Sequence, residues 1–404
     1  MPVRATKRGA ERTPLSPDWD VVVCGASFAG LAVSRELSGT GARVLMIDRY
    51  EIGERQTSAC AAPTVWLEAL GLESSIRQTF PDLVFHTPRK TLRWRLPWTF
   101  STFDYRELCA LLRAQSPSVQ FDTATVEGRE GFTIKTDRGD LRAPLIVDAL
   151  GWRRVLSNAP DPIQPPNARL SRGLEVHPPG TGEELELWLD PKYVRSGYSW
   201  SFPADDEVRV GVGSFDPHDH VKEPTVRLAG DLDRAAEGYQ GNWIPHQMRA
   251  PVEDAVFFTG DSAGHCLPTT AEGIRTAWYF GIACGRELQL VLEGQQTRDQ
   301  ALGRYAAFCE EHRWAFDWLL RVQRLVGRVN PHPAPMTFGL SVLGAPSFVR
   351  WAFDHYLEIA PPPASRTRGA HARRSAADRA RRRDDGSVPT RGPATAAAAR
   401  PPRS

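Results

Sequence analysis

Two glycines spaced for a dinucleotide-binding turn lie near the start of the chain. Gly25 and Gly30 enclose the segment Gly-Ala-Ser-Phe-Ala-Gly, which follows the apolar run 20–24 and begins a stretch with helical periodicity. Gly25 permits a tight turn, and Gly30 lets the helix approach the strand closely. The helix start then offers free N–H groups and a positive dipole end to a pyrophosphate. The residues expected to contact the cofactor here are Gly25, Ser27, Phe28, Ala29 and Gly30.

A carboxylate closes the next strand. The run 43–48 ends in Asp48, roughly 20 residues beyond the glycine turn, where an acidic side chain receives a ribose hydroxyl. Arg49 follows directly and is expected at the same cofactor site. Ser27 replaces the central glycine of the usual pattern, but its small side chain can still admit a phosphate. Strand, turn, helix, strand and acid together favour a nucleotide site over a glycine-bearing turn of an unrelated α/β protein.

A second segment near residue 260 decides between dinucleotides. Gly260 and Asp261 directly follow the apolar run 255–259, so the carboxylate can hold ribityl hydroxyls. Gly273 and Ile274 open the next helix, whose N–H groups can lie against the N1/C2 carbonyl region of a flavin. That helix dipole stabilises the anionic reduced flavin. Two separated motifs for one cofactor predict FAD instead of NAD.

These motifs carry a resemblance to a known group of proteins. The chain resembles the flavoprotein superfamily that contains aromatic hydroxylases, flavin halogenases and geranylgeranyl reductases, over roughly residues 18–320. The Gly260–Asp261 segment resembles the second FAD motif of that superfamily, and Asp148 in LIVDALG resembles its middle motif. The resemblance also implies that Arg106, in FDYRELCALL, contacts the FAD from a helix; the alternative is a solvated helix arginine.

One strand points within the superfamily to the geranylgeranyl reductases. Tyr198, Trp200 and Phe202 precede a proline and a later Gly-x-Gly pair, which resembles the element that lines a long apolar cavity in those reductases. Alternate residues of a strand face one way, so the three rings can form one aromatic wall that binds substrate. The alternative is that they form ordinary core. Cys60 falls where those reductases carry a cysteine close to the flavin, although a buried cysteine is usually a small hydrophobe.

The predicted fold class is α/β: a Rossmann-like FAD domain, an inserted antiparallel-sheet substrate domain and C-terminal helices. Alternating runs such as EVRVGV predict the antiparallel sheet, and the βαβ pattern predicts the parallel one. The expected boundaries are a flexible leader 1–17; an FAD domain 18–80, 104–160 and 250–295; a substrate domain 81–103 and 161–249; helices 296–360; and a disordered Arg/Ala/Pro-rich tail 361–404.

Composition excludes several classes. Residues 365–404 carry 11 Arg and 3 Asp, so the other residues are mildly acidic and offer no nucleic-acid surface. Six cysteines without a Cys-x-x-Cys pair predict no metal site, and they indicate reduced thiols in a cytoplasmic protein. No stretch of about 20 apolar residues could span a membrane, which leaves peripheral membrane contact open.

The predicted activity is reduction of carbon–carbon double bonds in an apolar, isoprenoid-like substrate by hydride from reduced FAD. Tyr198, Cys60 or water would complete protonation, and NAD(P)H or a reduced redox partner would supply electrons. An FAD-dependent monooxygenase is the first alternative, and a flavoprotein cyclase or isomerase without net redox is the second. Halogenation is disfavoured because the Trp-x-Trp-x-Ile-Pro element is missing. Two FAD motifs beside a cavity strand disfavour a binding module.

Overall fold

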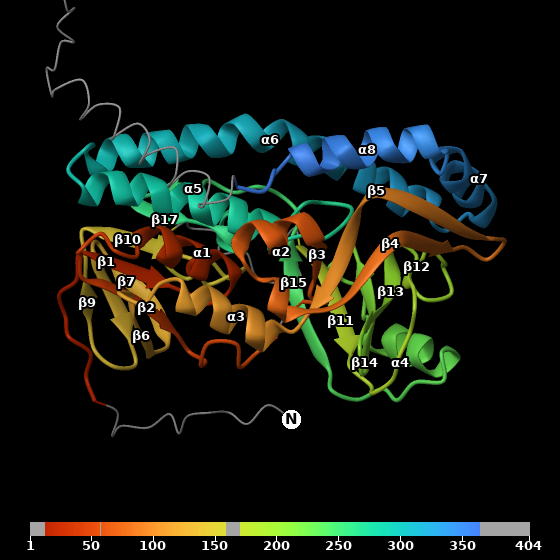
Figure 1. Ribbon diagram of the computed structural model, residues 1–404, viewed down its shortest axis with the longest axis horizontal. Helices are drawn as coiled ribbons and strands as arrows, with labels where there is room; N and C mark the ends of the chain where they lie inside the picture. The colour runs from red at the N-terminus through yellow and green to blue at the C-terminus, as the bar shows by residue number, and fades with distance from the viewer. Residues whose placement is uncertain (1–12, 57, 159–169, 364–404) are drawn as a thin grey trace, which may run out of the picture. The chain divides into compact units, whose positions relative to one another are not determined.

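A parallel sheet forms the nucleotide-binding half of this computed structural model, which describes residues 13–56, 58–158 and 170–363 (Figure 1). The strand order is β16-β17-β10-β1-β2-β6, and only β16 runs antiparallel to its neighbour. The strands are β1 Val21–Cys24, β2 Val44–Asp48, β6 Gln120–Thr123, β10 Leu145–Asp148, β16 Val252–Glu253 and β17 Val256–Phe258. Both faces are buried, which explains the unbroken apolar runs.

Alternate residues of β1 serve the two covers of this sheet. Val21 and Val23 pack beneath α1 (Phe28–Leu37), α3 (Tyr105–Ala114) and α5 (Ile274–Leu292). Val22 packs on the opposite face, against a three-stranded sheet of β7 (Val126–Glu130), β8 (Thr133–Thr136) and β9 (Leu141–Arg142). Gly281 brings α5 close to α1, since a Cβ there would lie 2.8 Å from the carbonyl oxygen of Ala29.

A second sheet of eight strands has the order β15-β11-β14-β13-β12-β4-β5-β3. Its strands are β3 Ala61–Pro63, β4 Ile76–His86, β5 Thr91–Phe103, β11 Leu170–Val176, β12 Leu185–Trp188, β13 Gly197–Ala204, β14 Glu207–Ser214 and β15 Gln240–Pro245. All pairs are antiparallel except β12 with β4. The predicted antiparallel sheet is therefore present, and it also takes in β3 and the start of β4, which the expected boundaries give to the FAD domain.

The eight-stranded sheet has two different faces. Val208, Val210 and Val212 of β14 pack against α4 (Lys222–Asp231). The other face carries Tyr198 and Phe202 of β13, in one cluster with Met336, Leu340 and Val349 from the C-terminal helices. These helices are α6 (Arg298–Val329), α7 (Pro333–Leu343) and α8 (Pro346–Glu358), which lie along one side of both sheets (Figure 1). Short helices α2 (Thr64–Leu70), η1 (Glu73–Ser75) and η2 (Gly260–Ala263) complete the order.

This arrangement confirms the predicted α/β fold class. Of the predicted leader, residues 13–17 are described. They lie beside the sheet of β7, β8 and β9, where the amide of Leu15 donates to the carbonyl of Arg138. Residues 364–404, which hold nearly all of the predicted tail, lie outside the described residues.

Candidate cofactor and substrate site

Close backbone contacts leave no room for a side chain at the glycines of the first motif. Gly25 has φ +111°, and a Cβ there would lie 2.2 Å from the carbonyl oxygen of Ala149 in the LIVDALG segment. A Cβ on Gly30 would lie 1.8 Å from the carbonyl oxygen of Gly25. On the other side, a Cβ on Gly260 would lie 2.9 Å from that of Ala29. Three segments distant in sequence therefore meet at the start of α1, as the motifs predict for one shared ligand.

The start of α1 is left open for an anion. Ser27 is the N-cap residue, but its side chain makes no capping bond; its hydroxyl instead lies 3.0 Å from that of Tyr105. Phe28 is buried, with its ring edge-on to Phe103 and Trp278, so only its backbone faces the turn. Free N–H groups at a helix N-terminus form an anion site.

Asp48 supports the glycine turn from the end of β2. Its carboxylate accepts hydrogen bonds from the amides of Ala26 (2.9 Å) and Tyr50 (3.1 Å). Burial raises the pKa of Asp48, and these amide bonds counteract that shift. A carboxylate has about four acceptor sites, so Asp48 retains capacity for a ribose hydroxyl. Arg49 and Arg106 are exposed, and the guanidinium of Arg49 lies 4.9 Å from the ring of Tyr50.

The carboxylate of Asp148 is occupied by hydrogen bonds from within the protein. Its side chain has no exposed surface, and it accepts bonds from the Ser262 hydroxyl (2.6 Å) and the amides of Leu150 (2.9 Å) and Leu156 (2.8 Å). These bonds tie the middle motif to the Gly260 segment. We therefore assign Asp148 to the support of the site, which replaces its expected direct contact with the cofactor.

Asp261 is the carboxylate with free acceptors. It is partly buried, makes no side-chain hydrogen bond to any described residue, and has its pKa raised to about 6 by burial, partly offset by Arg249. Arg249 donates Nη1 to the carbonyl of Trp152 (2.8 Å), while its buried Nε and Nη2 have no partner among the described residues. Burial lowers the pKa of Arg249 to about 10. Sequence reasoning missed Arg249, because it lies in a loop outside every motif.

Hydrogen bonds to α6 hold the turn between η2 and α5 in place. Gly273 is the N-cap of α5 without a side-chain cap, and Ile274 is buried behind it. Thr269, at φ +69°, donates its amide to the Gln323 side chain (2.9 Å) and its hydroxyl to the carbonyl of Leu319 (2.7 Å), both in α6. The backbone amides that open α5 therefore stay available, as the FAD interpretation requires.

These features fit FAD. Glycines clear the space beside two helix starts, the N-terminal turns lack side-chain caps, and the Asp261 carboxylate is uncommitted. A dinucleotide needs anion binding at one end and hydrogen-bond acceptors for its sugar hydroxyls, which this set provides. Among the described residues, no cluster of side chains could hold a metal ion.

Trp200 lies flat over a row of glycines. A Cβ on Gly211 would lie 2.2 Å from the indole ring, and one on Gly213 would lie 3.3 Å from it. Both glycines pair with β13 directly, Gly211 opposite Trp200 and Gly213 opposite Tyr198. The Trp200 ring centroid is 6.1 Å from that of Tyr198 and 6.4 Å from that of Phe202. The three rings thus share one half-buried face.

Tyr198 joins this face to the second FAD motif. Its hydroxyl donates to the carbonyl of Thr270, 2.6 Å away, in the turn between Asp261 and Gly273. Burial raises the pKa of Tyr198, so the phenol keeps its proton. The aromatic wall therefore borders the segment expected to hold the flavin.

Cys60 is fully buried in a strained turn. Its φ is +52°, an uncommon value for a residue with a side chain. Burial raises the pKa of its thiol well above the ordinary value, so Cys60 is a neutral thiol. Its carbonyl accepts bonds from the amide of Phe103 (3.0 Å) and from Nη1 of Arg209 (3.1 Å).

Arg209 belongs to a buried charged network beneath the wall. Its Nε donates to Glu207 (2.9 Å), and Glu207 lies 3.7 Å from His177 Nδ1. His177 Nε2 lies 2.9 Å from Glu175, which in turn accepts the indole N–H of Trp200 (3.1 Å). The network extends from the Cys60 turn to Trp200. Sequence reasoning did not single out these four charged residues, since only strand register reveals their common face.

His265, which follows the Gly260 motif, is internal. It has no exposed surface, and its ring stacks on Phe280 with centroids 3.9 Å apart. Burial lowers the pKa of His265 to about 3, so the ring is neutral.

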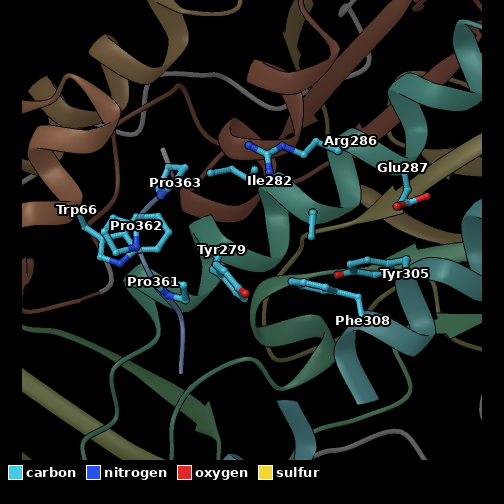
Figure 2. A pocket seen from close by; sticks show the side chains of 11 residues that line it. Trp66, Tyr279, Ile282, Arg286, Glu287, Tyr305, Phe308, Pro361, Pro362 and Pro363 are labelled. Carbon is cyan, nitrogen blue, oxygen red and sulfur yellow. The ribbon is translucent and has the colours of Figure 1, made fainter. Parts of the chain in front are cut away.

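One defined cavity lies away from these residues. It measures about 290 Å³ and lies between α5, α6 and the segment 361–363. Figure 2 shows Trp66 and Pro362 at one end of it and Tyr305 and Phe308 at the other. No predicted site residue lines it, so it is separate from the aromatic wall.

Asp261→Ala is expected to raise the dissociation constant for FAD about 10- to 150-fold. A hydrogen bond to a charged group contributes roughly 1.5–3 kcal/mol, and this carboxylate has no competing partner. Titration of the FAD-free protein followed by flavin fluorescence measures it. Asp140→Ala, which removes a surface carboxylate, is the control and should leave the constant unchanged. An unchanged constant for Asp261→Ala would remove that residue from the site.

Curated proteins are similar to this chain over most of its length. Digeranylgeranylglycerophospholipid reductase 3 of Methanosphaera stadtmanae is 24% identical over 330 residues, which cover 72% of this chain and 83% of the relative. The digeranylgeranylglycerophospholipid reductase of Methanococcus vannielii is 23% identical over 334 residues, 75% of this chain and 85% of that protein. A scan against protein-family models finds no match.

Solved structures share the fold. A geranylgeranyl bacteriochlorophyll reductase-like protein from Thermoplasma acidophilum superposes with a TM-score of 0.69 at 16% identity, over 77% of this chain and 88% of that one. None of the helices in the described part of the chain is long and apolar enough to cross a membrane. The comparisons confirm the resemblance predicted from the motifs: the chain is similar to the geranylgeranyl reductase-like FAD-dependent oxidoreductases.

Proposed function

We propose that the protein is an FAD-dependent reductase that saturates carbon–carbon double bonds of an apolar, isoprenoid-like substrate. The observation that carries this proposal is the aromatic wall of β13, which meets the second FAD motif through the bond from Tyr198 to Thr270. The named activity of the archaeal relatives supports it. NAD(P)H or a reduced redox protein would supply the electrons, and the free cysteines suit the reducing cytoplasm.

The chain's own residues divide the work. The open turns at Gly25 and Gly273 would hold the cofactor, with Asp48 and Asp261 on its hydroxyl groups and Arg106, which has no side-chain partner among the described residues, at its edge. The chemistry that reduced FAD would supply there is hydride transfer to the double bond. The rings of Trp200 and Phe202 would bind the isoprenoid chain and exclude water from it.

A proton must reach the second carbon. Tyr198 and Cys60 both carry a proton at neutral pH, because burial raises the pKa of each. Cys60 has no exposed surface, whereas Tyr198 is half-buried on the wall. Tyr198 is therefore the better-placed donor, and Cys60 would shape the turn.

The test is an anaerobic incubation of dithionite-reduced enzyme with a polyprenyl lipid, followed by mass spectrometry. A reductase adds two hydrogen atoms per double bond. A product that forms only in air and gains one oxygen atom would identify a monooxygenase. A product of unchanged mass would identify an isomerase or cyclase.

Gly211→Ala is expected to lower kcat/KM on the order of 10- to 100-fold while FAD content stays unchanged. The added methyl group would lie 2.2 Å from the Trp200 ring, so the wall must shift, and small displacements of a binding surface have such effects. Steady-state rates and flavin absorbance measure the two properties together. Gly303→Ala, where a Cβ meets nothing within 4 Å, is the control. Normal turnover in Gly211→Ala would make the wall ordinary core.

A further inference from the structure

Large apolar side chains are concentrated on the outside of the C-terminal helices. Trp314, Trp318 and Leu325 of α6 are 58–68% exposed, and Phe338 of α7 is 71% exposed. Trp351 of α8 is 56% exposed. The remaining exposed members in these helices are Val342, Leu343 and Phe348. Elsewhere in the described residues, only Phe132, Val226 and Tyr239 are exposed large hydrophobics. Such a concentration marks an interaction surface.

The exposed residues form stripes on their helices. Trp314, Trp318 and Leu325 are spaced by four and seven residues, so they share one face of α6. In α7, Phe338 and Val342 point outward, while Met336 and Leu340 pack inward. Figure 1 shows α6, α7 and α8 along the same side, beyond the sheets. We call the exposed residues of these three helices the outer helical face.

Positive charge dominates the central part of this face. From residue 318 to residue 353 the sequence has four arginines and no lysine, aspartate or glutamate, whereas the exposed Glu310, Glu311 and Asp317 flank Trp314. Arg321, Arg324 and Arg328 are exposed on α6 beside Trp318 and Leu325. Aromatic residues combined with basic residues on surface helices are typical of segments that lie in the interface of a membrane.

We propose that the outer helical face binds the surface of an anionic lipid bilayer. Charge decides the partner: a second copy of the chain would oppose these four arginines with the same four, whereas anionic headgroups attract them. The aromatic rings would enter the boundary between headgroups and acyl chains, and the arginines would contact phosphates.

The position of the face gives this binding a use, and this step rests on the proposed function. Met336 and Leu340 of α7 and Val349 of α8 pack in one cluster with Tyr198 and Phe202 of the wall. The same helices therefore touch the predicted substrate surface with one side and present apolar rings to the outside with the other. A lipid substrate would reach the wall from the bilayer without crossing water.

The test is co-sedimentation of the full chain with vesicles of phosphatidylcholine alone or mixed equally with phosphatidylglycerol. The variant Trp318→Ser/Phe338→Ser/Trp351→Ser is expected to bind mixed vesicles about tenfold more weakly, since each ring contributes buried apolar area. Phe132→Ser/Tyr239→Ser removes two exposed rings elsewhere and should bind as the wild type does. Arg321→Gln/Arg324→Gln/Arg328→Gln should lose the preference for phosphatidylglycerol.

Two results would overturn the proposal: absence of wild-type binding, or wild-type binding by the triple aromatic variant, which would assign any binding to another part of the chain. A wild-type dimer that the aromatic variant dissociates would instead assign the face to self-association. Flavin content and activity on a detergent-dispersed polyprenyl lipid are measured alongside. If the wild type shows no activity on the dispersed lipid, the reductase function is contradicted, but the result of the vesicle experiment still stands.

Discussion

Arg209→Leu is expected to lower the free energy of unfolding by about 3–5 kcal/mol, the usual cost of removing one partner from a buried ionic group. The Arg209 side chain is 2% exposed. It donates to the carbonyls of Ala59 (2.9 Å), Cys60 (3.1 Å) and Phe103 (3.0 Å), and it pairs with Glu207. Leucine removes all of these interactions, and the Cys60 carbonyl then keeps only the amide of Phe103 as a donor. Chemical denaturation monitored by fluorescence measures the loss.

Two further variants distinguish the loss of hydrogen bonds at Arg209 from the general effect of removing an arginine. Arg209→Lys keeps the charge but cannot span all the acceptors, so it should restore part of the stability. Arg95→Leu removes a surface arginine that is 73% exposed, and it should cost less than about 1 kcal/mol. Equal stability of Arg209→Leu and the wild type would mean that water satisfies these carbonyls.

Wild-type stability is expected to fall as the pH rises from 6.5 to 9, by up to about 3 kcal/mol from His177 alone. Burial by itself would lower the pKa of His177, but its bonds to Glu175 and Glu207 raise it to about 9. The folded protein therefore holds a proton that the unfolded chain releases. This contribution is complete below pH 6.5 and is lost as the pH passes 9. Denaturation at a series of pH values in this window measures it.

His177→Gln should flatten that pH dependence. Its matched control is His218→Gln, which changes a histidine that is 64% exposed and pairs with Asp216 near the surface. The control should keep the wild-type slope. If His177→Gln also keeps the slope, the ion pairs with Glu175 and Glu207 do not hold the proton.

Local sequence patterns were sufficient to predict the fold class. Strand β1, the Gly25–Gly30 turn and helix α1 are contiguous, so periodicity and glycine spacing describe them directly. The common face of Tyr198 and Trp200 follows from the period of a single strand. These features depend on neighbours in sequence.

Residues whose partners are distant could not be predicted. In EVRVGV, Arg209 alternates with valines as a solvent-facing residue would. Its acceptors are nevertheless the backbone carbonyls of Cys60 and Phe103, which are more than 100 residues away in sequence. Arg249 approaches Asp261 only through loop packing. Asp148 matched a motif, but sequence could not show that Ser262 and two amides occupy its carboxylate.

The pairing of Arg275 with the end of α8 limits how the chain can be divided. Arg275 has no exposed side-chain surface; it pairs with Glu272 at 2.7 Å and donates to the carbonyls of Leu357 (3.2 Å) and Ala360 (3.1 Å). Glu272 and Arg275 lie at the start of α5, whereas the carbonyls belong to Leu357 at the end of α8 and to Ala360 just beyond it. A chain cut before α8, or one recombined there with a relative, would leave the buried guanidinium of Arg275 without these carbonyl acceptors. We therefore expect α8 and the residues just beyond it to be needed for the packing of α5, so that α8 cannot be exchanged alone as a module.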